Sequence, residues 1–166
     1  MQEEITEDAP GVDFVIATDL DNDGDKDILF SSSNLINSDS KIGWLENEDG
    51  QGNFGLLQTI TTDLEGASSV YSTDIDGDGD LDVVASSEDD SQITWYENMD
   101  GLGAFGVQNI ISNNENETQS VYATDIDNDG DMDICVGSKF AVTWYENLDG
   151  LGGFSDSQLI YQLFHH

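Results

Sequence analysis

The fold of this chain is decided by the stretch Asp19-Leu20-Asp21-Asn22-Asp23-Gly24-Asp25-Lys26-Asp27, which places five aspartates within nine residues. Written as a pattern it is D-x-D-x-D-G-x-x-D, and the same pattern returns at residues 74–82 and 125–133. Five like charges in so short a stretch repel one another unless a cation neutralises them. The neighbouring sequence supplies no cluster of Lys or Arg, so we expect each stretch to be a metal-binding loop.

Calcium suits such a loop better than other common cations. It takes about six to eight oxygen ligands in flexible geometry, whereas magnesium keeps most of its waters. The glycine of the pattern allows a sharp turn between ligands. The loop is not an EF-hand, because the twelfth positions lack the required glutamate; they are Phe30, Ala85 and Val136. A solvated acidic turn is the alternative, and three recurrences with unchanged spacing speak against it.

Apolar, partly β-branched runs flank each loop and predict strands rather than helices. Around the first loop they are Phe14-Val15-Ile16-Ala17 and Ile28-Leu29-Phe30. A second recurring block follows in every repeat: a Trp-x-Glu-Asn segment, an Asp-Gly turn typical of a hairpin, and a last apolar run. The Trp-x-Glu-Asn segments begin at Trp44, Trp95 and Trp144.

Each repeat of about fifty residues therefore predicts four antiparallel strands, which is typical of a β-propeller blade. We predict an all-β fold of three four-stranded blades, formed by residues 12–64, 65–115 and 116–163. Residues 164–166, with His165 and His166, are expected to be a tag remnant, and Met1 an added start. The acidic start Met1-Gln2-Glu3-Glu4 lacks the apolar region of a signal peptide.

The composition excludes several partners. A formal net charge of −33 with only three lysines repels nucleic acid and anionic membranes. No apolar segment is long enough to predict membrane insertion. The single cysteine, Cys135, is expected to be a buried core residue, so no internal disulfide can form and calcium would be the main staple of the fold.

The aromatic residues of the third strands have two interpretations. Trp44, Trp95 and Trp144 could stack on sugars, but strands inside a propeller are covered on both faces, so we expect them in the core. Their neighbours Glu46, Glu97 and Glu146 are expected to accept hydrogen bonds from turn amides rather than to act in catalysis.

The repeated loops, Trp-x-Glu-Asn segments and Gly-x-Gly-x-Phe hairpins together resemble the FG-GAP/VCBS repeat family, over roughly residues 12–161. Members form propeller blades, as in integrin α-subunit heads and certain fungal lectins. The resemblance implies three Ca²⁺, one per repeat, held by the side chains at the first, third, fifth and ninth loop positions and by the backbone carbonyl at the seventh. The implied metal-binding residues are Asp19, Asp21, Asp23, Asp25 and Asp27 in the first loop, Asp74, Asp76, Asp78, Asp80 and Asp82 in the second, and Asp125, Asp127, Asp129, Asp131 and Asp133 in the third.

Three blades are fewer than the roughly four to eight of a closed propeller. Two chains could close a six-bladed ring as a homodimer, the chain could be a fragment of a longer propeller, or the repeats could stack in an open array. The sequence leaves these three open.

We expect a calcium-stabilised extracellular module for adhesion, binding a glycan or a protein. A structural spacer of a cell-surface or fibre protein is an alternative. A polysaccharide-degrading enzyme is disfavoured, because the chain has no Arg and its two His are residues 165 and 166. We therefore expect no enzymatic activity.

Overall fold

A computed structural model describes residues 11–33 and 40–163. The expectations for Met1, for the first four residues and for residues 164–166 concern parts of the chain outside these ranges. The described residues contain no helix, and hence none that could span a membrane. They form twelve strands: β1 Val12–Thr18, β2 Asp27–Ser32, β3 Lys41–Leu45, β4 Gln58–Thr61, β5 Ala67–Thr73, β6 Asp82–Ser87, β7 Gln92–Tyr96, β8 Asn109–Ser112, β9 Thr118–Thr124, β10 Asp133–Ser138, β11 Ala141–Tyr145 and β12 Gln158–Gln162.

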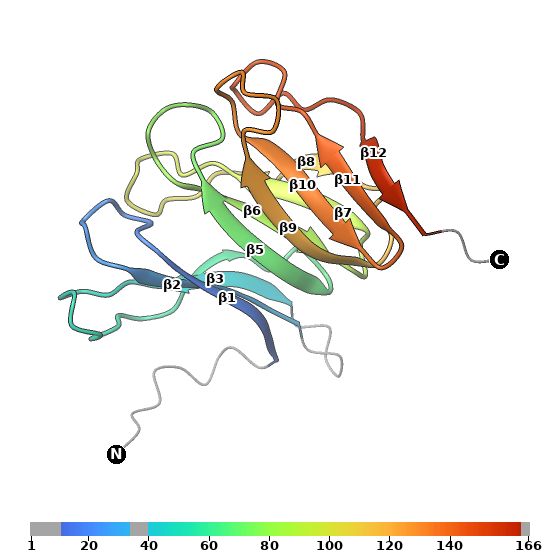
Figure 1. Ribbon diagram of the computed structural model, residues 1–166. Helices are drawn as coiled ribbons and strands as arrows, with labels where there is room; N and C mark the ends of the chain where they lie inside the picture. Colours follow the sequence, from blue (N-terminus) through green and yellow to red (C-terminus); the bar gives the residue numbers. More distant parts are fainter. Residues whose placement is uncertain (1–10, 34–39, 164–166) are drawn as a thin grey trace.

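The strands build three separate four-stranded antiparallel sheets, each from four consecutive strands. Blade 1 is β1–β4, blade 2 is β5–β8 and blade 3 is β9–β12. Figure 1 shows the blades fanned out in chain order, with blades 1 and 3 at the two ends and no closure between them. The predicted all-β fold with three four-stranded blades is thus confirmed.

Local sequence explains the connections within a blade. The aspartate loop joins the first and second strands, which pair up to Thr18 opposite Asp27. The Asp-Gly turn joins the third and fourth strands, and beyond them an isolated bridge pairs Asn47 with Phe54; blades 2 and 3 repeat this bridge. The first strands are longer than the apolar runs predicted, because polar residues such as Ser69 also pair in the ladder, here with Ser86.

The blades pack face to face, with their first strands next to one another. We call the face that points to the following blade the C-side face and the opposite one the N-side face. One core lies between blades 1 and 2, where Leu29, Ile42 and Trp44 meet Val70 and Tyr96. The second core repeats this arrangement between blades 2 and 3, where Val84, Ile93 and Trp95 meet Val121 and Tyr145.

The two outermost faces are different, because no described residue forms a blade over them. The prediction that the tryptophans are core residues holds for Trp44 and Trp95, which are 1% and 7% exposed, whereas Trp144 is only half-buried. The prediction that Cys135 is a buried core residue is wrong: it is half-buried. Both exceptions lie on the C-side face of blade 3, which lacks a neighbour.

Candidate metal centres

The three aspartate loops lie at the ends of the first strands β1, β5 and β9. Their carboxylates shape the loops by accepting backbone N–H groups. In the first loop the amide of Gly24 donates to Asp19 Oδ2 (3.1 Å) and that of Asp25 to Asp23 Oδ1 (2.8 Å). The other loops repeat both bonds. Gly24 has φ +98°, a left-handed conformation that explains why glycine stands at the sixth position.

The ninth aspartate ties each loop to the hairpin of its own blade. Asp82 is fully buried, its Oδ2 accepts from the amide of Ile75 (2.9 Å), and its Oδ1 accepts from the amide of Asn98 (2.9 Å). Asp27 and Asp133 make the corresponding pairs of bonds. The ninth carboxylate therefore has a structural role whether or not a metal is bound.

The loops bring carboxylates together in three clusters. Ligand oxygens within 4.8 Å of one another come from Asp19, Asp21 and Asp27 in the first loop, from Asp74, Asp76 and Asp78 in the second, and from Asp125, Asp127 and Asp133 in the third. The first and third positions are common to all three clusters. The ninth joins them in two loops and the fifth in one, so Asp23, Asp82 and Asp129 lie outside these groups.

The donor atoms fit calcium. All are carboxylate oxygens, which a hard cation prefers. Asp19 Oδ1 is also buried and has no hydrogen-bond partner among the described residues, which is unfavourable for a carboxylate oxygen unless a cation contacts it. The residues that would hold the ion are those of the three clusters, with the fifth and ninth positions completing each set.

The seventh-position side chains point away from the clusters. A Cβ added to Gly50 would lie 2.3 Å from Asp25 Oδ1, so this carboxylate sits against the hairpin turn of its own blade. Asp80 and Asp131 sit likewise against Gly101 and Gly150. Asp80 also accepts a bond from Asn22 Nδ2 of the preceding loop (2.9 Å). The seventh-position side chains thus belong to none of the three clusters, and a role for the backbone carbonyls of these residues stays a prediction.

Burial and mutual repulsion make the apo clusters costly to ionise. Burial raises the pKa of Asp82 to about 7, although the N–H bonds from Asn98 and Ile75 oppose the rise. Burial and neighbouring carboxylates also raise the pKa of Asp21 and of Asp76. A divalent cation would remove this penalty.

Glu46 belongs to the same electrostatic neighbourhood, which the sequence did not reveal. Burial and then the charge of Asp21 raise its pKa, and Glu97 and Glu146 act on the third positions of their own loops. Among the described residues, no turn amide donates to these glutamate side chains as expected: Glu46 and Glu146 accept from Gln58 and Gln158 instead.

The neighbouring asparagine takes the role assigned to the glutamate. Asn98 Oδ1 accepts from the turn amide of Gly103 (3.0 Å), and its Nδ2 donates to Leu20 O of the preceding aspartate loop (2.9 Å). Asn147 repeats both bonds, with Ile75 O as the acceptor. The recurrence of Asn after Glu in all three repeats was the available signal.

The family model for the FG-GAP-like repeat matches residues 19–85 and 74–136, which together cover more than two thirds of the chain. Each match begins at the first aspartate of one loop and ends in the strand that follows the next loop. The chain belongs to the FG-GAP-like repeat family. A comparison with curated proteins gave no match. Members of the FG-GAP family often bind Ca²⁺ in such loops, which agrees with the three clusters.

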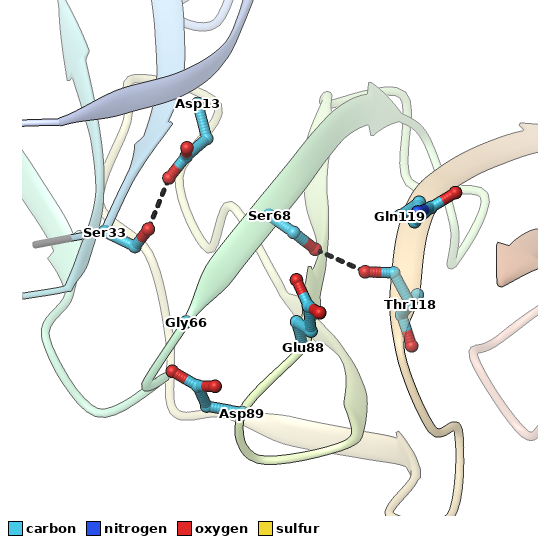
Figure 2. Close-up of a pocket in the computed structure, with 8 residues that line it drawn as sticks. All are labelled: Asp13, Ser33, Gly66, Ser68, Glu88, Asp89, Thr118 and Gln119. Carbon is cyan, nitrogen blue, oxygen red and sulfur yellow. Dashed lines mark hydrogen bonds between the residues drawn. The ribbon is translucent and has the colours of Figure 1, made fainter. Parts of the chain in front are cut away.

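A cavity of about 340 Å³ opens at the other end of the first strands, where the three FG-GAP repeats converge. Figure 2 shows that all three blades contribute to it. Ser33 donates to Asp13 (2.5 Å) and Ser68 to Thr118 O (3.1 Å), while Glu88 and Asp89 line one side. Carboxylates, hydroxyls and the amide of Gln119 make this cavity rich in hydrogen-bond acceptors.

Proposed function

We propose that the protein is a calcium-binding, extracellular β-propeller module that binds a glycan or a protein. The observation that carries the calcium part is the threefold recurrence of an all-carboxylate cluster, one member of which has a buried oxygen without a partner. FG-GAP repeats are typical of extracellular proteins, where calcium is abundant. Extracellular calcium modules bind with Kd on the order of 10⁻⁴–10⁻³ M, so the sites would fill outside the cell and stay empty in the cytosol.

Equilibrium dialysis against radioactive calcium tests the metal part. We expect three Ca²⁺ per chain, with little displacement by an equal concentration of Mg²⁺, because a loop of many carboxylates dehydrates calcium more readily than magnesium. A stoichiometry below one, or equal affinity for both ions, would reject the proposal.

We propose that the ligand binds in the 340 Å³ cavity where the three blades converge. Its lining offers Asp13, Glu88 and Asp89 as acceptors, which suit the hydroxyl groups of a neutral glycan or the lysines of a protein and repel anionic ligands. We propose binding rather than catalysis, because no Arg exists in the chain and the described residues that line the cavity include no His to activate Ser33 or Ser68 as a nucleophile.

A glycan array tests the ligand part, with Glu88→Gln as the variant and Asp49→Asn as a control. Asp49 is an exposed hairpin residue outside the cavity. Binding that Glu88→Gln weakens and Asp49→Asn leaves unchanged would support the cavity. An empty array together with no protein captured through this surface would favour the structural-spacer alternative.

A further inference from the structure

The two interfaces between blades follow one scheme. A hairpin glycine lies on the tryptophan of the preceding blade: a Cβ on Gly103 would fall 2.3 Å from the ring of Trp44, and one on Gly152 would fall 2.5 Å from Trp95. The hairpin asparagine donates to the preceding loop at 2.9 Å in both cases. An inner-strand valine, Val70 or Val121, is buried against the preceding blade.

The two outer faces each have one side of such an interface: blade 3 has the tryptophan, and blade 1 has the hairpin glycine and the valine. On the C-side face of blade 3, Trp144 is half-buried with an indole N–H that has no partner among the described residues, while Ile160 is 57% exposed. On the N-side face of blade 1, Val15 is 55% exposed. No described atom lies within 4 Å of a Cβ placed on Gly52, which is the equivalent of Gly103.

Side-chain sizes on these two faces compensate each other. Two adjacent positions of the second strands, which point to opposite faces, meet in each core: Leu29 shares a core with Ala85, and Val84 shares the next core with Val136. The residues left over at these two positions are Cys135 on the C-side face of blade 3 and Phe30 on the N-side face of blade 1. If blade 3 faces blade 1, the small Cys135 meets the large Phe30, which is 3% exposed and lies against Gly43 of its own blade.

A second pair of positions, at the ends of the third and fourth strands, also differs between the observed and the outer faces. Thr61 of blade 1 lies near the phenol of Tyr96, and Ser112 of blade 2 near that of Tyr145. The equivalent residues on the outer faces are Tyr161 on blade 3 and Leu45 on blade 1. At this pair of positions each interface would then contain one tyrosine, which the following blade contributes in the two observed interfaces and the preceding blade, through Tyr161, in the proposed one. The surroundings of Leu45 on blade 1 that would receive Tyr161 are apolar, since Leu57 packs over Gly43.

We propose that a second copy of this chain places the N-side face of its blade 1 on the C-side face of blade 3, and that the reciprocal contact closes a ring of six blades. Both contacts are then identical and related by a twofold axis, and no apolar face stays exposed. Six blades fall within the range of closed propellers. In the new interfaces Trp144 would lie on Gly52, and Asn47 Nδ2 would donate to Ile126 O, as Asn98 donates to Leu20 O.

Light scattering of the full chain after size-exclusion chromatography tests this, in about 0.15 M salt and millimolar calcium so that repulsion between two acidic chains is screened. We expect about twice 18.1 kDa for the wild type. Ile160→Lys on blade 3 and Val15→Lys on blade 1 should each give a folded monomer, because a charge enters the closed interface. Ile110→Lys is the matched control: Ile110 is 56% exposed, close to the 57% of Ile160, but lies on the middle blade, and its variant should stay dimeric.

A monomeric wild type would overturn the proposal, and so would species larger than a dimer, which indicate an open array. Dissociation by Ile160→Lys but not by Val15→Lys would mean that blade 3 pairs with itself, which contradicts the head-to-tail contact. Circular dichroism shows that each variant is folded and equilibrium dialysis that it still binds calcium, so loss of the dimer is distinguishable from loss of calcium binding.

Discussion

At the scale of single residues, alternate aspartates of one loop have different roles. Asp78 and Asp80 are two residues apart, yet only Asp78 has an oxygen in the carboxylate cluster, while Asp80 sits against Gly101. We predict that Asp78→Asn lowers the number of bound Ca²⁺ from three to two, and that Asp80→Asn keeps three. Equilibrium dialysis measures both. Equal losses for the two variants would show that the side chains of this loop are not divided in this way.

Asp82 gives the apo protein a characteristic pH dependence. Its pKa in the folded state is about 7, above its ordinary value of 3.8, because of burial. The folded state therefore favours the protonated form, so this contribution to stability is complete below the ordinary value and is lost as the pH rises through 7. In calcium-free buffer, the unfolding free energy should fall between pH 5 and pH 8.

Urea denaturation at several pH values measures this trend. With saturating calcium the trend should reverse, because protons compete with the cation for the same carboxylates. Asp82→Asn, which cannot ionise, should flatten the apo curve. An apo protein that becomes more stable toward pH 8 would show that Asp82 is not the dominant group.

At the scale of elements, the hairpin between the third and fourth strands joins neighbouring blades. Gly103 and Gly52 both have φ +88°, but only Gly103 lies against a tryptophan of the preceding blade. Replacement by Ala strains the backbone by about 1–2 kcal/mol at either site. At Gly103 the added Cβ would also displace Trp44, so Gly103→Ala should lower the unfolding free energy by about 1–3 kcal/mol more than Gly52→Ala.

Urea denaturation in the Ile160→Lys background compares the two glycine variants, because in that background we expect no second chain to meet Gly52. Equal destabilisation of both variants would mean that the structure around Trp44 adjusts without cost.

The elements also show what the sequence could and could not predict. Apolar runs and Asp-Gly turns, which are local signals, predicted the strands, their number per repeat and the position of the loops. The hydrogen bond from Asn98 to Leu20 O joins residues 78 positions apart, and a single repeat gives no sign of it. The half-buried state of Trp144 and Cys135 was missed for a related reason: the repeat pattern assigns them to a core, but burial depends on the next blade.

At the scale of the whole molecule, the net charge of −33 opposes folding, because like charges lie closer together in the compact state. Three bound Ca²⁺ would reduce it to about −27 and would act where the carboxylates are most crowded. Since the clusters form only when the first two strands of a blade pair, binding free energy adds to folding free energy. At a calcium concentration 100 times Kd, each site contributes about 2.7 kcal/mol.

We therefore predict that chelation lowers the melting temperature by about 5–10 °C for each site that is emptied, given a shift of about 2–4 °C per kcal/mol for a chain of this size. Differential scanning calorimetry at one protein concentration, with calcium, with EDTA and with EDTA followed by excess magnesium, measures this effect. Magnesium should restore little of the loss. Because only the clusters hold calcium in this argument, chelation should lower the melting temperature of the Asp78→Asn variant by about two thirds of the wild-type shift, and that of Asp80→Asn by the full wild-type shift. A melting temperature that chelation leaves unchanged would mean that the packed blades alone overcome the repulsion among the aspartates.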